Sequence, residues 1–274
     1  MVRRYDWEMG WLIMSKKVVL VTGGGRGIGR EICMAFASEN THIALTYTRD
    51  VQSAEQVKQT LTERHISCSV HPLNVQDFSL CQSVVDAVER EYGTINVLVN
   101  NAGVTLSKQF VNCDETENEA VLSTNLQGVM NMTLATVPSL KKSTKNAELG
   151  RIVNISSNTS LCGNAGQVAY SVTKAGVNGF TRVCARTLAH HDIVVNAVAP
   201  GYIDTDMTHD LPESTYSHVL KVSAMKRTGR VEDVSAIGGD GVEDGVDQGA
   251  LAGARSAEQQ RVLTGEQAHV GRLA

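Results

Sequence analysis

Short runs of β-branched and other apolar residues alternate with longer amphipathic stretches along most of this chain, and no other feature constrains its fold as strongly. The short runs have the length of buried strands, and the stretches between them have helical spacing. The predicted strands are Val18–Val21, Ile43–Thr48, Ser67–Leu73, Val97–Asn100, Arg151–Ser156 and Val194–Val198. The predicted helices are Arg30–Ser38, Ser53–Arg64, Phe78–Tyr92, Glu117–Leu140 and Ala169–His190.

Strands that alternate with helices predict an α/β fold, namely a Rossmann-like, doubly wound parallel sheet with helices on both faces. Right-handed crossovers place the carboxyl end of every strand at one edge of such a sheet, where ligands bind. A chain of 274 residues fits a single domain of this kind. We expect that domain to cover residues 16–274.

The two ends of the chain depart from this pattern. We expect residues 1–15 to form a poorly ordered extension, although Trp7 and Trp11 lie at helical spacing and could instead form an apolar docking stripe. The apolar piece of this extension is too short for the core of a signal peptide. Residues 237–254 are rich in Gly and Asp, so we expect a loop or a weak helix there, before a short strand near Arg261–Thr264.

Composition excludes several kinds of partner and cofactor. The net charge of −4 and the pI near 6.1 give no general attraction to nucleic acid or to an anionic membrane. No apolar run approaches the ~20 residues that cross a bilayer. We predict no metal site, because there is no Cys-x-x-Cys pair or His cluster, and we expect reduced thiols in a cytoplasmic protein. The six scattered cysteines are Cys33, Cys68, Cys81, Cys113, Cys162 and Cys184.

A glycine-rich turn follows the first predicted strand and precedes the first predicted helix. Glycines there let the main chain turn tightly and approach a pyrophosphate, whose charge the free N–H groups of the helix N-terminus can meet. The spacing differs from the general dinucleotide pattern G-x-G-x-x-G, so a turn without a ligand is the alternative. The candidate cofactor contacts in this turn are Thr22, Gly23, Gly25, Arg26, Gly27, Ile28 and Gly29.

The end of the second predicted strand bears on the choice between NADPH and NADH. An NAD site usually carries an acid there to bind the ribose 2′-hydroxyl. This strand ends at Thr48 and Arg49, and the first carboxylate is Asp50. The guanidinium groups of Arg26 and Arg49 suit a 2′-phosphate, so we expect NADPH. If the strand ends a few residues later, Asp50 takes the NAD role instead.

Tyr170 and Lys174 lie four residues apart in a predicted helix, with Ser157 thirteen residues upstream of the tyrosine. Residues at i and i+4 share one helix face, so the lysine ammonium can favour the ionised tyrosine and lower the pKa of the phenol. Such a phenol can exchange protons with a carbonyl oxygen that Ser157 holds. A Tyr-x-x-x-Lys pair by itself is also a common exposed helix face. Ser156 is the neighbouring serine, but the thirteen-residue separation favours Ser157.

These motifs together resemble the classical short-chain dehydrogenase/reductase family over roughly Lys16 to Asp233. The resemblance implies that Asn125, Ser157, Tyr170 and Lys174 form the catalytic set, with Asn125 holding a proton-relay water and Lys174 also binding the nicotinamide ribose. It implies a dinucleotide cofactor. The further cofactor contacts that it implies are Asn74, Val75, Asn101, Ala102, Gly103, Pro200, Gly201, Ile203 and Thr205. Asn74 replaces the family's usual Asp and can still accept the adenine hydrogen bond.

Within the family, the chain is most similar to 3-oxoacyl-[acyl-carrier-protein] reductases, through the segments around Ser157, Tyr170 and Pro200. The resemblance implies NADPH-dependent reduction of a 3-oxoacyl thioester to the 3-hydroxyacyl product, in fatty-acid or polyketide-type synthesis, by a homo-oligomer. An acyl carrier protein is acidic, so basic residues near the active-site edge are candidate contacts, with solvated surface charges as the alternative. These residues are Lys141, Lys142, Lys145, Arg182 and Arg186.

Two other functions stay open at this stage. The chain could be a short-chain alcohol dehydrogenase or reductase that acts on a free small ketone or sugar. It could also be a weakly catalytic, cofactor-binding subunit that scaffolds a paralogue. This alternative is suggested by the extension that carries Trp7 and Trp11 and by the C-terminal region, where the apolar helix that the family uses in its tetramer is diluted with Gly and Asp.

Overall fold

A computed structural model describes residues 16–146, 149–206, 208, 213–223 and 225–235. Within them, six parallel strands form one sheet in the order β3-β2-β1-β4-β5-β6. The predicted extension at 1–15, the Gly/Asp-rich segment 237–254 and the short strand near 261–264 lie outside the described residues. The strands are β1 Lys17–Val21, β2 Thr41–Tyr47, β3 Ser67–Pro72, β4 Ile95–Asn100, β5 Gly150–Ile155 and β6 Ile193–Val198.

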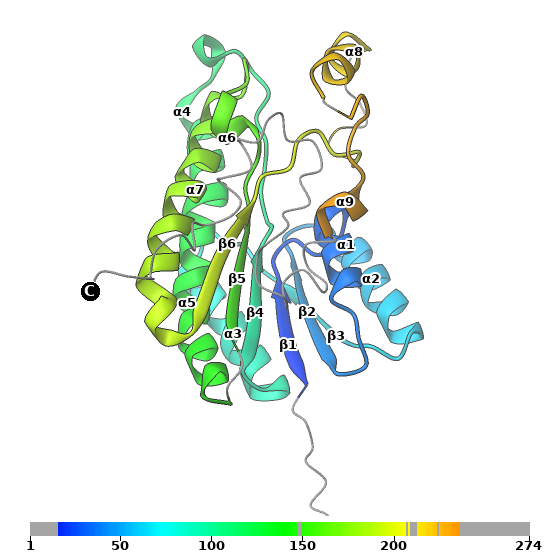
Figure 1. Ribbon diagram of the computed structural model, residues 1–274, viewed down its shortest axis with the longest axis vertical. Coiled ribbons are helices and arrows are strands. Elements are labelled where there is room, and N and C mark those ends of the chain that lie inside the picture. Colours follow the sequence, from blue (N-terminus) through cyan, green and yellow to red (C-terminus); the bar gives the residue numbers. More distant parts are fainter. Residues whose placement is uncertain (1–15, 147–148, 207, 209–212, 224, 236–274) are drawn as a thin grey trace, which may run out of the picture.

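Helices cover both faces of the sheet (Figure 1), which confirms the predicted doubly wound α/β fold. Helices α1, α2 and α9 pack on one face, and α3, α5 and α7 pack on the other. The α-helices are α1 Gly27–Ala35, α2 Val51–Glu63, α3 Phe78–Tyr92, α4 Glu115–Leu122, α5 Gly128–Ser143, α6 Thr159–Cys162, α7 Val168–Leu188, α8 Glu213–Val222 and α9 Val231–Ser235. Short 3-10 turns occur at Phe110–Asn112, Thr144–Asn146 and Ala189–His191.

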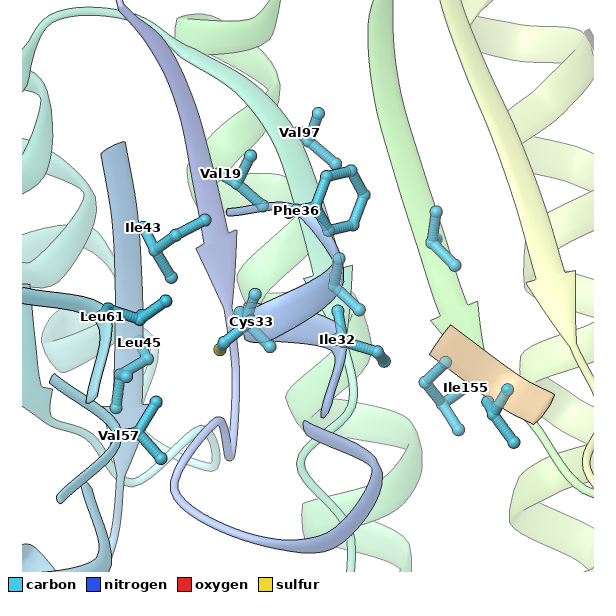
Figure 2. Close-up of a cluster of buried hydrophobic side chains, with 14 of the residues drawn as sticks. Val19, Ile32, Cys33, Phe36, Ile43, Leu45, Val57, Leu61, Val97 and Ile155 are labelled. Atoms are coloured by element: carbon cyan, nitrogen blue, oxygen red, sulfur yellow. The ribbon is translucent and has the colours of Figure 1, made fainter. Parts of the chain in front are cut away.

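The period of two along β1 divides the core between the two faces. Val19 and Val21 point to the layer of α1 and α2, whereas Val18 and Leu20 point to the layer of α3 and α5. Figure 2 shows the first layer, where Cys33 of α1 and Leu61 of α2 meet the β2 side chains. The β1 strand is therefore apolar and buried from Val18 to Val21, as expected for a parallel sheet covered on both sides.

Aspartate side chains cap the N-termini of three helices, α2, α3 and α4. Asp50 accepts a hydrogen bond from the Ser53 N–H at the start of α2, and Asp77 does the same for the first turn of α3. Asp114 and Glu117 form a reciprocal capping box at α4. These caps satisfy N–H groups that a helix leaves unpaired at its start.

The stretch predicted as one helix from Glu117 to Leu140 is divided in the structure. Helix α4 ends at Leu122, a π-helical segment follows at Ser123–Gln127, and α5 continues from Gly128 to Ser143. A π segment inserts a wider turn into an otherwise α-helical path, and apolar periodicity does not reveal it.

The strand order places the topological switch point of the sheet between β1 and β4. The chain leaves β1 for one side of the sheet and returns to β4 on the other, so the loops after these strands diverge there. Figure 1 shows α6 and α8 near the same end of the sheet. The sequence-predicted site residues gather at this edge.

Candidate active site

The glycine turn after β1 has a conformation that side chains would prevent. Gly23 and Gly27 have φ values of +64° and +51°, in the left-handed region that favours glycine. A Cβ on Gly29 would collide with the carbonyl oxygen of Gly23 and the side-chain nitrogen of Asn101. The turn is therefore tightly folded against the loop after β4.

Thr22 and Asn101 join the ends of β1 and β4. The Thr22 hydroxyl accepts hydrogen bonds from the N–H groups of Asn101 at 2.9 Å and Ala102 at 3.0 Å. In return, the Asn101 amide donates to the carbonyl oxygens of Thr22 and Gly23 at 2.9 and 3.0 Å. Predicted cofactor residues from two motifs, 79 positions apart, thus form one rigid unit.

The start of α1 differs from the starts of α2, α3 and α4. Its capping residue, Arg26, has an extended backbone and makes no side-chain cap, and the first turn contains no acid. The N–H groups and the positive end of the helix dipole remain available for an anion. Together with glycines that keep side chains out of the turn, this end fits the pyrophosphate of a dinucleotide.

Residues near the end of β2 bear on the ribose site. The strand ends at Tyr47, and the Thr48 hydroxyl donates to the Leu73 carbonyl at 2.9 Å. Asp50 already caps α2, and its pKa is lowered by hydrogen bonds from Ser53 and, to a smaller extent, by the charge of Arg26. The side chain of Arg49 is exposed. The carboxylate that could have taken the NAD role is thus engaged at the helix start.

The loop after β3 contains the two predicted contacts for the adenine. Asn131 of α5 donates to the carbonyl oxygens of Val75 and Gln76 at 3.0 and 3.1 Å, which fixes the main chain there. Val75 is buried against Gly128, where a Cβ would lie 2.5 Å from a Val75 methyl. The Asn74 side chain is exposed and accepts the N–H of Gln76 at 3.2 Å.

Tyr170 and Lys174 lie in the first part of α7 and share one face. The Lys174 ammonium lies 5.6 Å from the centroid of the Tyr170 ring and donates to the Ile155 carbonyl at 2.6 Å. Lys174 is only 4% exposed, and this burial lowers its pKa to about 8. It therefore keeps its proton at neutral pH but loses it under mildly alkaline conditions.

The expected lowering of the Tyr170 pKa by Lys174 does not occur in this structure. Burial raises the pKa of the phenol, and a hydrogen bond with Ser157 lowers it by a smaller amount. The ammonium lies beside the ring and is bonded to Ile155, so desolvation of the phenolate dominates. The phenol is consequently protonated at neutral pH, as a proton donor must be.

Ser157 and Ser156 have different partners, which decides between the two candidates. The Ser156 hydroxyl donates to the main-chain oxygen of Lys174 at 3.1 Å and so supports α7. The Ser157 hydroxyl accepts from the N–H and hydroxyl of Thr159 at 3.3 and 3.2 Å and interacts with Tyr170. Ser157 is therefore the serine that lies beside the phenol.

Asn125 is fully buried in the π segment. Its side-chain oxygen accepts the Val104 N–H at 2.8 Å, and its nitrogen donates to the Val104 carbonyl, also at 2.8 Å. A Cβ on Gly103 would lie 3.2 Å from the Asn125 oxygen and 3.7 Å from the Lys174 ammonium. Asn125 and Lys174 therefore both lie next to Gly103, in the loop after β4.

The segment after β6 completes the site. The Pro200 carbonyl accepts the N–H of Asn158 at 2.9 Å, next to Ser157. Ile203 pairs with Gly229 in a parallel bridge. A Cβ on Gly27 would lie 3.5 Å from the Thr205 methyl, so Thr205 flanks the glycine turn. Gly201 continues the main chain between Pro200 and Tyr202.

The basic residues predicted near the active site lie at the opposite end of the sheet, where the strands start. Helix α5 ends beside the start of β5, where a Cβ on Gly150 would lie 3.4 Å from Thr144 and 3.5 Å from Leu140. Lys141, Lys142 and Lys145 follow this helix end, and Lys142 pairs with Glu89 at 2.8 Å. Arg182 and Arg186 lie about three or more helical turns beyond Tyr170. The prediction is wrong because helices of a parallel sheet run back to the edge where the next strand starts.

A polar clasp beside the site was not predicted from sequence. The Gln167 amide donates to the hydroxyls of Thr105 and Ser107, each at 3.2 Å, and its oxygen accepts from Asn164 at 2.9 Å. Asn164 also donates to the Tyr202 hydroxyl at 3.3 Å. The clasp connects the loops after β4 and β6 to the start of α7. Polar residues in loops have no periodicity, so nothing in the sequence marked them.

The glycine turn, the half-buried tyrosine and the buried lysine and serine define a dinucleotide-dependent oxidoreductase of the Rossmann type. The family described as short chain dehydrogenase matches residues 17–215. The chain therefore belongs to the short-chain dehydrogenase family, as its motifs indicate. Members of this family bind a nicotinamide cofactor and act on CH–OH or C=O groups.

Several named relatives are similar over most of their length. The chain is 40% identical to the 3-oxoacyl-[acyl-carrier-protein] reductase FabG of Thermotoga maritima, over 82% of this chain and 89% of that one. It is 36% identical to FabG of Staphylococcus aureus, over 80% and 87%. It is 37% identical to Nodulation protein G of Azospirillum brasilense, over 81% and 88%.

A solved structure supports the fold. The putative short-chain alcohol dehydrogenase from Sinorhizobium meliloti matches with a TM-score of 0.76 at 30% identity, over 92% of this chain and 93% of that one. Among the described residues, no helix has the length and apolar character needed to span a bilayer, and no group of His, Cys, Asp and Glu could hold a metal ion. All six cysteines have free thiols.

Proposed function

We propose that this chain is an NADPH-dependent ketoreductase that reduces a 3-oxoacyl thioester, carried on an acyl carrier protein, to the 3-hydroxyacyl product. The observation that carries the proposal is the meeting of Tyr170, Lys174 and Ser157 with an uncapped, glycine-lined helix start at one edge of the sheet. The names of the FabG relatives support the choice of substrate.

Each of the three side chains has one task in the reduction. A bound nicotinamide dinucleotide supplies the hydride. The Ser157 hydroxyl holds the carbonyl oxygen, and the protonated Tyr170 phenol donates its proton to that oxygen. The Lys174 ammonium lies beside the ring, and the N–H donors that it does not use on the Ile155 carbonyl would bind the hydroxyls of the nicotinamide ribose. Asn125 fixes the main chain around Val104, behind the lysine.

NADPH is favoured over NADH by the charges around the ribose site. Asp50 is engaged as the cap of α2, so it competes poorly for the ribose hydroxyls. Arg26 stands at the start of α1 and Arg49 is exposed just after β2. Guanidinium groups bind phosphate oxygens in a bidentate manner, so these two residues suit a 2′-phosphate.

The proposal is tested with the purified full chain, an acetoacetyl thioester and either NADPH or NADH. We expect the NADPH absorbance to fall with time, and the rate at limiting cofactor to be higher with NADPH than with NADH. The same thioester on an acyl carrier protein should be the better substrate. No reduction of either thioester, despite reduction of free ketones, would contradict it.

A second candidate function is the reduction of a free small ketone or sugar by an alcohol-dehydrogenase-type enzyme. It is favoured by the similarity to the Sinorhizobium meliloti protein, whose title describes a putative short-chain alcohol dehydrogenase. A panel of free ketones and alcohols, run beside the thioesters under identical conditions, separates the two candidates.

We further propose a cytoplasmic homo-oligomer, either a dimer or a tetramer, with a complex of this chain and a paralogous subunit as the alternative. Six free thiols suit a reducing compartment. Solution mass measurement, alone and with the carrier protein, tests this arrangement.

A further inference from the structure

The face of α7 that carries Tyr170 and Lys174 continues one turn further to Asn178. These three residues follow one another at intervals of four, so they lie in a row along the helix. Asn178 is 4% exposed, and its side-chain nitrogen donates to the Ser160 hydroxyl at 2.7 Å. Asn178 is too far along the helix to share the tyrosine's position, yet it contacts the segment that holds Ser157.

Ser160 passes this contact on to the catalytic serine. Its hydroxyl donates to the main-chain oxygen of Ser157 at 2.5 Å, and its N–H donates to the same oxygen at 3.0 Å. Because the hydroxyl hydrogen is used on Ser157, the Ser160 oxygen needs a donor as its other partner, which the Asn178 amide provides. A continuous hydrogen-bonded path thus runs from α7 to the peptide of Ser157.

The other end of the Asn178 side chain indicates that this path is the reason for an asparagine here. Its carbonyl oxygen is buried and has no hydrogen-bond partner. A buried polar atom without a partner is unfavourable, so an apolar residue would suit the site better if only packing mattered. The asparagine is therefore best explained by what its nitrogen holds.

We propose that Asn178 is a positioning residue for the carbonyl reduction: through Ser160, it fixes the Ser157 hydroxyl relative to the Tyr170 phenol. The inference rests on the proposed function, since it assigns Asn178 to the same site. Helix α7 therefore positions the three catalytic side chains from one face. It carries Tyr170 and Lys174 itself, and it holds Ser157 through the contact of Asn178 with Ser160.

The test uses Asn178→Ala, Ser160→Ala and the double variant of the full chain. With acetoacetyl thioester and NADPH, we expect kcat to fall about tenfold in each single variant, less than the ~10²–10³-fold cost of deleting a donor to the reacting oxygen. The double variant should lose no more than the worse single variant, because both substitutions break one path. The KM for NADPH should stay unchanged.

Thr181→Ala is the matched control. Thr181 is also buried on α7 and accepts a side-chain hydrogen bond, from Asn154 at 2.9 Å, but among the described residues its side-chain hydrogen bonds do not involve Ser157 or Ser160. We expect its kcat to match that of the unmodified chain. An equal fall of kcat in Thr181→Ala and Asn178→Ala would mean that Asn178 acts only on general stability, and would overturn the inference.

A substrate-free measurement separates failure of this inference from failure of the proposed function. The titration of Tyr170 is obtained from the tyrosinate absorbance of each variant minus that of its Tyr170→Phe counterpart. Because the hydrogen bond with Ser157 lowers the Tyr170 pKa, that pKa should rise in Asn178→Ala and stay constant in Thr181→Ala. An unchanged Tyr170 pKa together with an unchanged kcat would overturn the inference, whichever substrate the chain reduces.

Discussion

Beside β1 and β2 the site is made of main chain and of glycines, whereas beside β4, β5 and β6 it is made of buried polar side chains. The first half has an uncapped helix start and a turn into which Gly29 brings no side chain. The second half holds Lys174 and Asn125 at 4% and 0% exposure, each with hydrogen-bond partners. The first half thus leaves space for a cofactor because it lacks side chains, and the second half provides buried polar groups for the reaction.

The difference means that the two halves fail in opposite ways. Adding side-chain atoms should damage the cofactor half, because main-chain N–H groups are the binding groups there and an added side chain would block them. Removing atoms should damage the catalytic half, because its buried Lys174 and Asn125 side chains have specific hydrogen-bond partners. Thr22 and Asn101 join the two halves through reciprocal hydrogen bonds.

The largest effect is expected in the catalytic half, from Tyr170→Phe. This change removes only the phenol oxygen, which we take to be the proton donor, and positioned acids of this kind contribute about 10²–10⁴-fold to the rate. Turnover with the acetoacetyl thioester should fall by that factor, while NADPH affinity measured by fluorescence titration stays the same. Unchanged turnover would favour a scaffolding subunit over an enzyme.

In the cofactor half, Gly29→Ala should act on binding first. The added methyl meets the Gly23 carbonyl and the Asn101 amide, so the turn must move and give up phosphate contacts. Loss of one or two hydrogen bonds to a charged group, about 1.5–3 kcal/mol each, corresponds to about a hundredfold weaker NADPH binding by calorimetry.

Gly179→Ala is the control for that substitution. A Cβ on Gly179 meets no atom within 4 Å, and the residue lies inside α7. We expect unchanged NADPH affinity and a free energy of unfolding higher by up to about 1 kcal/mol, because Gly disfavours helix interiors. If both variants lost NADPH affinity equally, close packing of the turn would not be the cause.

The pH dependence of kcat/KM should report the buried lysine. Burial lowers the Lys174 pKa to about 8, so its proton is present below that pH and lost as the pH rises through it. Since a neutral amine is a weaker hydrogen-bond donor to the nicotinamide ribose than an ammonium, kcat/KM for reduction should fall by up to about tenfold per pH unit above pH ~8. A profile that stays flat well into the alkaline range would contradict this role.

The smallest effect is expected at the rim of the cofactor half, from Arg49→Ala. An exposed guanidinium gains little from one phosphate contact in water, so NADPH affinity should fall only about three- to tenfold, and NADH affinity should not change. Arg64→Ala, which removes an exposed arginine at the end of α2, is the control and should affect neither cofactor. An equal loss of NADH affinity would show that Arg49 does not bind the 2′-phosphate.

The fold and most of the site could be predicted because their signals are local. The β1 run, the glycine turn and the four-residue interval between Tyr170 and Lys174 depend on neighbours along the chain. The clasp around Gln167 could not be predicted, since its partners Thr105 and Ser107 come from a loop about sixty residues away. The same holds for Asn178, whose partner Ser160 lies in another helix.

By itself, the amino-acid sequence determined the doubly wound sheet, the edge at which its motifs meet and the chemical groups available there, because strand and helix periods and glycine turns are properties of short segments. Only the tertiary structure decided that Ser157 faces the phenol while Ser156 supports α7, that the basic helix ends lie at the far edge, and that the Tyr170 pKa is raised. Those outcomes depend on burial and on distances between elements far apart in the chain.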